Sequence, residues 1–215
     1  MLKMKNITKL FLYLNLCLTL LACSKISPKG EIEVKDVTVE NFTKLNLKGD
    51  FKVFFAKGNQ NLVSVETYPN VYKNLDIEVE NGILTIEENR KTDQVDFYNI
   101  TIFGKNDLNE VSLSDKVEMN VSGQVKTPEF SLHLKGNSKF MGAVIAPKSK
   151  IEMAEKSNAN ILGETKNLNL KLADSASIMA PYFYVENLEI LSKNGASAGL
   201  NIDQEMKGTL ENTSK

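Results

Sequence analysis

The amino-acid sequence predicts an all-β protein built as a parallel β-helix, a solenoid whose coils of about 19–21 residues stack along one axis. Two observations predict this fold. From Val34 onward, apolar and polar residues alternate with the period of two that is typical of strands. In the second half of the chain, similar strand segments recur at a nearly constant spacing, and each is followed by a short polar turn.

The first residues are typical of a targeting signal. Three lysines and no acidic residue precede an apolar run from Leu10 to Leu21, which is shorter than the roughly 20 residues of a membrane-spanning helix. A basic segment followed by a short apolar one predicts a secretory signal peptide. The run ends in Leu20-Leu21-Ala22-Cys23, which looks like a bacterial lipobox. We therefore expect residues 1–22 to be a lipoprotein signal peptide and Cys23 to be lipidated. The alternative is an ordinary signal peptide that contains this cysteine by chance.

Residues 23–38 are expected to form a lipidated tether, because its first part is polar and includes Pro28 and Gly30. Stable anchoring takes more than one acyl chain, and a lipidated N-terminal cysteine would supply several. Ser24, rather than aspartate, follows the cysteine. By resemblance to the usual sorting pattern, this favours the outer membrane. No acidic run of the kind that marks surface export follows, which leaves the face of that membrane open.

The folded body is expected over residues 39–212. Asn81-Gly82 lies between two alternating runs and predicts a β-hairpin. The segment after Pro69 favours one helical turn at residues 71–75. The charged residues 91–96 predict a loop. Alternating strands are expected at residues 42–47, 51–55, 62–66, 75–79, 83–86 and 99–103.

The second half contains an internal repeat. A single coil cannot bury its apolar face, so repeated coils must stack, with about 4.8 Å between strands, to form a continuous core. An up-and-down sandwich or barrel is the alternative, but it gives no reason for a fixed spacing. The predicted apolar anchors are Leu113, Leu134, Met153, Leu172 and Leu191, spaced 21, 19, 19 and 19 residues apart. Four residues after each anchor, we expect a small residue that faces the coil axis: Val117, Ser138, Ser157, Ala176 and Gly195.

Residues 42–53, residues 75–86 and the serial turns together resemble the "putative auto-transporter adhesin, head GIN domain" family. This domain of unknown function occurs largely in secreted and lipid-anchored proteins of Bacteroidetes-like bacteria. The resemblance extends over roughly residues 42–211. The family's Gly-Ser-Gly turns are degenerate here, as in Gly136-Asn137-Ser138, and its aromatic-Gly-Pro closing segment is missing, so the last coil is expected to be incomplete. The resemblance implies a right-handed, single-stranded parallel β-helix, no established catalytic residues and a role in adhesion.

Composition excludes several classes of function. The 26 basic and 27 acidic residues give a formal net charge of −1, which offers no excess of positive charge for nucleic acid. One histidine and two cysteines exclude a Cys/His zinc site, and Cys17 leaves with the signal peptide. Arg90 is the only arginine, which excludes an arginine clamp for phosphates or carboxylates. We expect neither a metal nor another cofactor.

No catalytic residues are expected, because catalysis needs titratable side chains that converge on one place. His133 lies between Leu132 and Leu134 and faces solvent if Leu134 is an anchor. A left-handed acyltransferase helix would need coils of about 18 residues. A β-helix polysaccharide lyase or glycosidase would need acids at a common place in the coil. We expect no such place for Glu118, Glu152, Glu155 and Asp174.

Two further segments are candidates for binding. Asp93, Asp96 and Asn99 carry oxygen ligands but match no calcium-loop spacing, so we expect a solvated loop. The segment Pro181-Tyr182-Phe183-Tyr184 is an aromatic cluster near a turn. We expect it to pack as a bulge on the neighbouring coil, and contact with a ligand is the alternative.

The sequence thus predicts a non-enzymatic cell-envelope lipoprotein with a β-helical binding or adhesion module. Its expected partners are the membrane, through the lipid on Cys23, and a glycan or protein ligand. No nucleic acid is expected. The alternatives are a β-helical carbohydrate-active enzyme and an envelope scaffold that forms homo-oligomers through the unpaired edge of the last coil.

Overall fold

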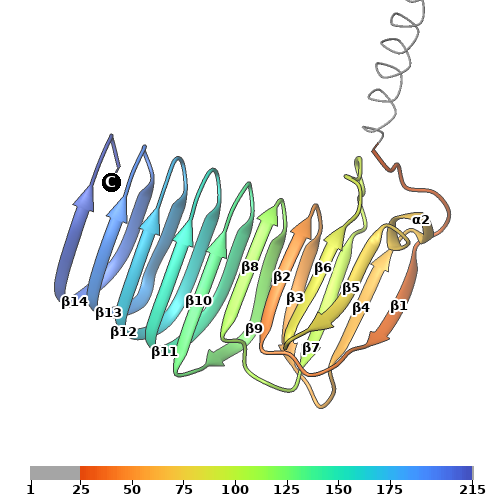
Figure 1. Ribbon diagram of the computed structural model, residues 1–215, viewed down its shortest axis with the longest axis horizontal. Helices are drawn as coiled ribbons and strands as arrows, with labels where there is room; N and C mark the ends of the chain where they lie inside the picture. The colour runs from red at the N-terminus through yellow and green to blue at the C-terminus, as the bar shows by residue number, and fades with distance from the viewer. Residues whose placement is uncertain (1–24, 215) are drawn as a thin grey trace, which may run out of the picture.

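The computed structural model describes residues 25–214, which form an almost entirely β structure with a solenoid of about five turns (Figure 1). The predicted all-β solenoid is confirmed. The elements are β1 (Glu33–Thr38), β2 (Lys44–Gly49), β3 (Lys52–Lys57), β4 (Leu62–Thr67), α2 (Pro69–Tyr72), β5 (Leu75–Glu80), β6 (Ile83–Glu88), β7 (Asn99–Gly104), β8 (Glu110–Asp115), β9 (Glu118–Lys126), β10 (Glu129–Leu134), β11 (Lys139–Met153), β12 (Asn158–Leu172), β13 (Ser177–Ser192) and β14 (Ser197–Leu210).

Each coil has two faces, joined by a tight turn at one edge and a corner at the other (Figure 1). The long strands β11 to β14 run along one face, bend at the corner and return along the other, and each pairs in parallel with the next. We call the edge with the tight turns the turn edge and the opposite one the corner edge. Face B contains β3, β7, β9 and the first halves of the long strands. Face A contains β2, β6, β8, β10 and the second halves.

The predicted repeat sets the register between coils. Leu134 pairs with Leu113 on one side and with Met153 on the other, and Met153 pairs with Leu172. All four side chains are buried, so they form an apolar ladder along face A. The small residues predicted to face the coil axis are fully buried at four of the five positions: Val117, Ser138, Ser157 and Ala176.

The fifth anchor was predicted one residue too early. Leu172 pairs with Ser192, which is fully buried, whereas Leu191 pairs with Lys171 on the outer surface. A β-bulge in β13 inserts one residue, and every later residue therefore shifts by one place. For the same reason, the small buried residue of the last turn is Ala196, and the predicted Gly195 is exposed.

The first coils are interleaved in sequence. β2 lies between β6 and β8, and β3 lies between β7 and β9. The coil formed by β2 and β3 therefore stands between two coils that follow it in the chain. The alternating pattern predicted these strands but not their order, because a period of two defines a strand's faces and not its neighbours.

Antiparallel strands close the N-terminal end. β4 pairs with β1 and β7, and β5 pairs with β6. The predicted hairpin is confirmed, since Asn81 and Gly82 have φ values of 52° and 76°, as a two-residue hairpin turn requires. β1 extends the folded body by its 6 residues beyond the predicted start at residue 39. α2 begins at Pro69, slightly before the predicted helical turn, because proline suits the first position of a helix.

The core is a column of apolar side chains between the two faces. Its largest fully buried members include Phe42, Phe55, Phe130 and Phe183. Full burial of one such side chain stabilises the fold by about 1.5–3 kcal/mol. The alternate side chains of every strand point outward, and these outer surfaces of faces A and B are where a partner can bind.

Candidate functional site

The outer surface of face A carries ladders of opposite charges. Glu152 forms ion pairs with Lys150 at 3.1 Å and with Lys171 of the next strand at 3.2 Å. Burial acts to raise the pKa of Glu152, but the two ammonium groups outweigh it and hold that pKa below its ordinary value. Lys44 and Glu110 form a similar pair at 3.0 Å. Because these charges neutralise one another, the surface holds no concentrated charge of one sign here.

His133 belongs to the same surface. It faces outward beside Ser112 and Glu152, as its place next to Leu134 predicts. Its Nδ1 lies 3.3 Å from a carboxylate oxygen of Glu152, and 34% of the side chain is exposed. His133 is therefore a neighbour of Glu152 on an open face of the solenoid.

On the outer surface of face B, the C-terminal coils expose several large apolar side chains. Met141 pairs with Asn120 and Asn160, so amide groups flank it along the row. A flat β surface that combines apolar side chains with amides offers both packing and hydrogen bonds to a partner. We call the exposed residues the tyrosine patch: Met141, Leu162, Met179, Tyr182 and Tyr184.

The bulge in β13 determines that the side chains of Tyr182 and Tyr184 face outward. Between Ile178 and Phe183, β13 has one residue more than the facing part of β12. Pro181 and Tyr182 therefore face outward in succession, after which Phe183 is fully buried and Tyr184 is exposed. The predicted packing as a bulge is confirmed for Phe183. The tyrosines are 65% and 56% exposed, as the alternative of ligand contact requires.

A groove of about 690 Å³ lies at the corner edge beside this patch. We call it the corner groove. Its volume falls within the roughly 300–1,000 Å³ of small-molecule sites. Tyr184 lines it together with polar and charged side chains of three neighbouring coils, among them Glu164, Lys166, Asn201 and Asp203. Sequence reasoning missed this groove because a corner brings together residues that are about one coil apart in the chain.

Two of the predicted acids share a place in the coil, contrary to the expectation that they would not. Glu155 and Asp174 both occupy the left-handed position of the turn, with φ values of 62° and 59°. Asn194 continues this row, and its side-chain amide donates to Asp174 at 3.4 Å. Aspartate and asparagine tolerate this conformation well, so turn geometry accounts for the row. Glu118 and Glu152 lie elsewhere, on faces B and A.

Asp93 and Asp96 of the charged loop and Asn99 at the start of β7 have different partners. Asp93 forms an ion pair with Lys25 at 3.0 Å, and Asp96 accepts a hydrogen bond from the Tyr68 hydroxyl at 2.8 Å. Asn99 donates to a glutamate of β4. Within residues 25–214, no group of three or more His, Cys, Asp or Glu side chains is placed to hold a metal ion.

A half-buried carboxylate lies where this loop meets the turn edge. Glu88 accepts hydrogen bonds from the Asp50 amide at 3.1 Å and from the Thr92 hydroxyl at 2.9 Å. Burial raises the pKa of Glu88 above its ordinary value, and these hydrogen bonds offset only part of that effect. Tyr98 lies nearby, and its own burial, with Glu88 beside it, raises the pKa of Tyr98. The sequence did not reveal this cluster because Asp50 and Glu88 are 38 residues apart.

The predicted lipidation site, Cys23, lies outside the described residues. In the part of the chain from Lys25 to Ser214, no helix is long and apolar enough to cross a membrane.

Comparison with known proteins gives one family and a group of similar structures. The model of the family described as "Putative auto-transporter adhesin, head GIN domain" matches residues 41–215. No curated protein matches the chain.

Three solved structures illustrate the similarity. A protein from Bacteroides fragilis described as a "putative adhesin" is 13% identical, with a TM-score of 0.66 over 87% of this chain and 99% of that one. A "putative lipid binding protein" from Parabacteroides distasonis is 15% identical, with a TM-score of 0.60 over 88% and 99%. A "putative adhesin" from Parabacteroides merdae is 14% identical, with a TM-score of 0.54 over 88% and 99%. At these identities, the matches show a shared fold.

Proposed function

The chain belongs to the family described as "Putative auto-transporter adhesin, head GIN domain", and from this premise we propose that it is a cell-envelope lipoprotein whose solenoid is a non-enzymatic adhesion module. The observation that carries the proposal is the tyrosine patch beside the corner groove. Monomeric proteins rarely expose several large apolar side chains together unless the surface binds a partner. A rigid solenoid is a suitable support, because its binding residues stand on paired strands.

The proposed ligand of this surface is a glycan. Tyrosine presents an apolar ring that can stack on the C–H face of a sugar and a hydroxyl that can hydrogen-bond to it. Asn201 and Asp203 line the corner groove with Tyr184 and supply the amide and carboxylate groups that sugar hydroxyls bind. The outward rows of successive coils repeat every 4.8 Å or so, which suits an extended chain of repeating units.

The N-terminus supports the lipoprotein part of the proposal. Ala22-Cys23 follows a short apolar run, and Ser24 follows the cysteine. A lipidated Cys23 would hold the module on the outer membrane. The ladders of paired charges on face A favour binding over catalysis, since Lys150 and Lys171 already neutralise Glu152 there.

A glycan array probed with the detergent-solubilised full-length protein tests the proposed ligand. We expect binding to at least one glycan class, with an affinity that falls more than about tenfold in a Tyr182→Ala, Tyr184→Ala double variant. Phe97→Ala is the matched control, because Phe97 is also an exposed aromatic residue, at 44%, but follows the charged loop, away from the tyrosine patch. An equal loss of glycan affinity in the double variant and in Phe97→Ala, or no loss in either, would contradict the assignment of the tyrosine patch as the glycan-binding surface. Cleavage of the bound glycan would favour the carbohydrate-active enzyme instead.

A second candidate function, a self-associating scaffold, is favoured by the C-terminal end. Residues of β14 that pair with core residues of β13 are themselves exposed, with Met206 at 64% and Leu210 at 54%. They lie on an edge strand, which invites pairing. Sedimentation of the wild type and of a Met206→Lys, Leu210→Lys variant tests this, with Met179→Lys as the control on face B. A wild type that stays monomeric at high concentration rules the scaffold out.

A further inference from the structure

The chain is bound to the folded body from the first described residues. The Ile26 amide donates a hydrogen bond to the Lys91 carbonyl at 2.9 Å, and the Asp93 amide donates to the Ile26 carbonyl at 3.0 Å. Lys25 adds an ion pair with Asp93 at 3.0 Å. The Ile26 side chain is partly buried against the core. Residues 25 and 26 therefore form a short two-stranded contact with the charged loop.

A second contact follows a few residues later. The side-chain amide of Asn70 in α2 donates to the Ser27 carbonyl at 2.9 Å, and its oxygen accepts from the Lys29 amide at 2.8 Å. The segment predicted to be a lipidated tether is thus attached to the folded body at two places before β1 begins. A chain held in this way cannot act as a flexible spacer between a lipid and the solenoid.

This attachment limits the distance from the solenoid to an anchor. Cys23 precedes Lys25 by two residues, and two residues span at most about 7 Å. If Cys23 carries the lipid, which is the premise taken from the proposed function, the bilayer surface lies within this distance of Lys25, plus the length of the lipid linkage.

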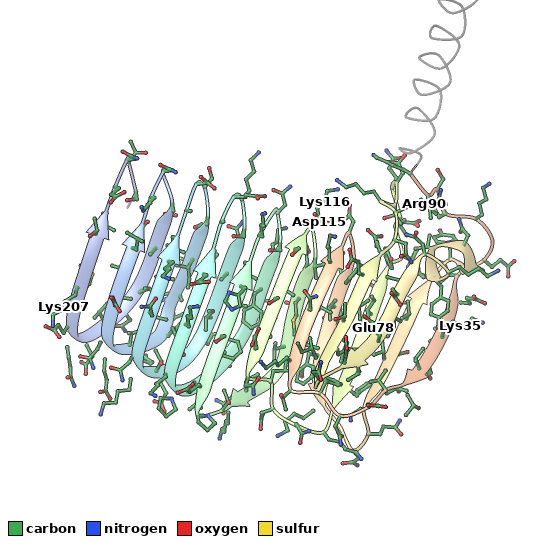
Figure 2. All side chains as sticks on the ribbon, in the orientation of Figure 1. Lys35, Glu78, Arg90, Asp115, Lys116 and Lys207 are labelled. Carbon is green, nitrogen blue, oxygen red and sulfur yellow. The ribbon has the colours of Figure 1, made fainter. Side chains whose placement is uncertain are left out.

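Lys25 lies at the turn edge of the solenoid. It lines a surface pocket together with residues from the turns of successive coils, among them Asp50, Lys116 and Glu155. Figure 2 shows Arg90, Asp115 and Lys116 along this edge, whereas Lys35 and Lys207 lie away from it. Two of the turns place an acid next to an exposed lysine, Asp115-Lys116 and Glu155-Lys156, and such charged side chains suit contact with lipid head groups rather than insertion among acyl chains.

The corner groove lies at the opposite edge, because each long strand crosses a whole face between its turn and its corner. We infer that the lipidated protein lies with its turn edge on the membrane surface, and that the corner groove is directed away from the membrane. The clamp formed by Ile26 and residues 91–93 sets this orientation. The partner of the turn edge is a lipid surface.

The mature chain allows a direct test, since processing removes Cys17 and a lipidated Cys23 has no free thiol. Single variants Lys91→Cys and Lys156→Cys on the turn edge, and Lys166→Cys at the corner edge, each add one thiol at an exposed lysine position. Each full-length, lipidated variant is labelled with a fluorophore and reconstituted into phosphatidylcholine vesicles that contain head-group spin-labelled lipid. We expect several-fold stronger quenching at residues 91 and 156 than at residue 166.

The outcomes separate this inference from its premise. Failure of the wild type to float with vesicles overturns the lipid anchor and, with it, the orientation. Flotation with equal quenching at all three positions overturns the orientation alone and leaves the anchor intact. Ile26→Pro removes the amide hydrogen that is donated to the Lys91 carbonyl. This variant should therefore show a smaller difference in quenching between the two edges, and it should still float with the vesicles. An unchanged difference in that variant would show that the clamp does not set the orientation.

Discussion

Leu172 and Ser192 lie side by side in the core, on adjacent parallel strands of face A, and Leu191 lies outside this core beside Lys171. In this part of β13, Leu191 thus faces outward, and its neighbour Ser192 faces inward. The inserted residue of the bulge in β13 causes this exchange, and the same insertion exposes Tyr182. One extra residue therefore changes both the core of the last coil and the proposed binding surface.

This register predicts opposite responses at neighbouring positions. Ser192→Asp should lower the free energy of unfolding by about 3 kcal/mol or more, because it places an unpaired charge in the core. Leu191→Asp should cost less than about 1 kcal/mol, because its side chain faces solvent and gains Lys171 as a neighbour. Urea unfolding followed by circular dichroism compares the two variants. A larger cost for Leu191→Asp would show that Leu191, and not Ser192, faces the core, as the equal spacing of the predicted anchors requires.

Glycines with left-handed φ values should differ in their tolerance of a side chain. Gly163 has a φ of 109°, and a Cβ added there would collide with the Val144 carbonyl. Gly123 has a φ of 83° with open space around its added Cβ. Gly123→Ala should cost about 1–2 kcal/mol, the cost of the left-handed backbone alone. Gly163→Ala should cost clearly more in the same measurement, and equal costs would contradict the close coil-to-coil contact.

Glu88 should make stability depend on pH. Its folded-state pKa is raised above 4.5, so the folded protein keeps this proton to a higher pH than the unfolded chain does. The stabilisation is fully present below the unfolded-state pKa and is lost as the pH rises through the folded-state pKa.

Glu88→Gln keeps a carbonyl oxygen for the Asp50 amide and an amide for the Thr92 oxygen. We expect this variant to gain stability relative to wild type on going from a pH below 4.5 to neutral pH, the direction that a raised folded-state pKa requires. Urea midpoints at the two pH values should show the gain, and a difference that does not change with pH would contradict the burial of this carboxylate.

Cys23→Ala should block processing as a lipoprotein. The variant is expected to lose the mass of the acyl chains and to leave the detergent phase in phase partitioning, since stable anchoring depends on those chains. Cys17→Ala is the matched control, because Cys17 lies within the apolar run that the signal peptide contributes. If the Cys23 variant is processed and partitions as the wild type does, the lipobox interpretation is wrong.

The sequence predicted those parts of the fold that depend on local patterns. Asn81-Gly82 specified its hairpin through backbone conformation, and the spacing of Leu113, Leu134 and Met153 specified the coil length. The interleaving of β2 between β6 and β8 was not predictable in this way. It depends on contacts between distant segments that carry no distinct periodicity.

The candidate site was predicted only in part for a related reason. The aromatic composition of residues 181–184 marked the segment, but the inward or outward direction of each ring depends on the bulge. A bulge arises from a mismatch of one residue between coils, as between Ile178 and Phe183, and it disrupts the very periodicity that sequence reasoning uses. The acids of the turns were likewise misjudged, because only the left-handed backbone of Glu155 and Asp174 reveals that they are equivalent.

Because the coil of β2 and β3 is interleaved, the N-terminal coils and the C-terminal coils assemble in different ways. The strands β2 and β3 complete their pairing only when β6 to β9 have been synthesised. The N-terminal block must therefore assemble as a unit across about 80 residues, from Lys44 to Lys126. From β10 onward, each coil contacts only its immediate neighbours, and a whole coil can be lost or duplicated without rearranging the others. Evolution can therefore lengthen or shorten this rod at its far end, one coil at a time, while the base stays constant.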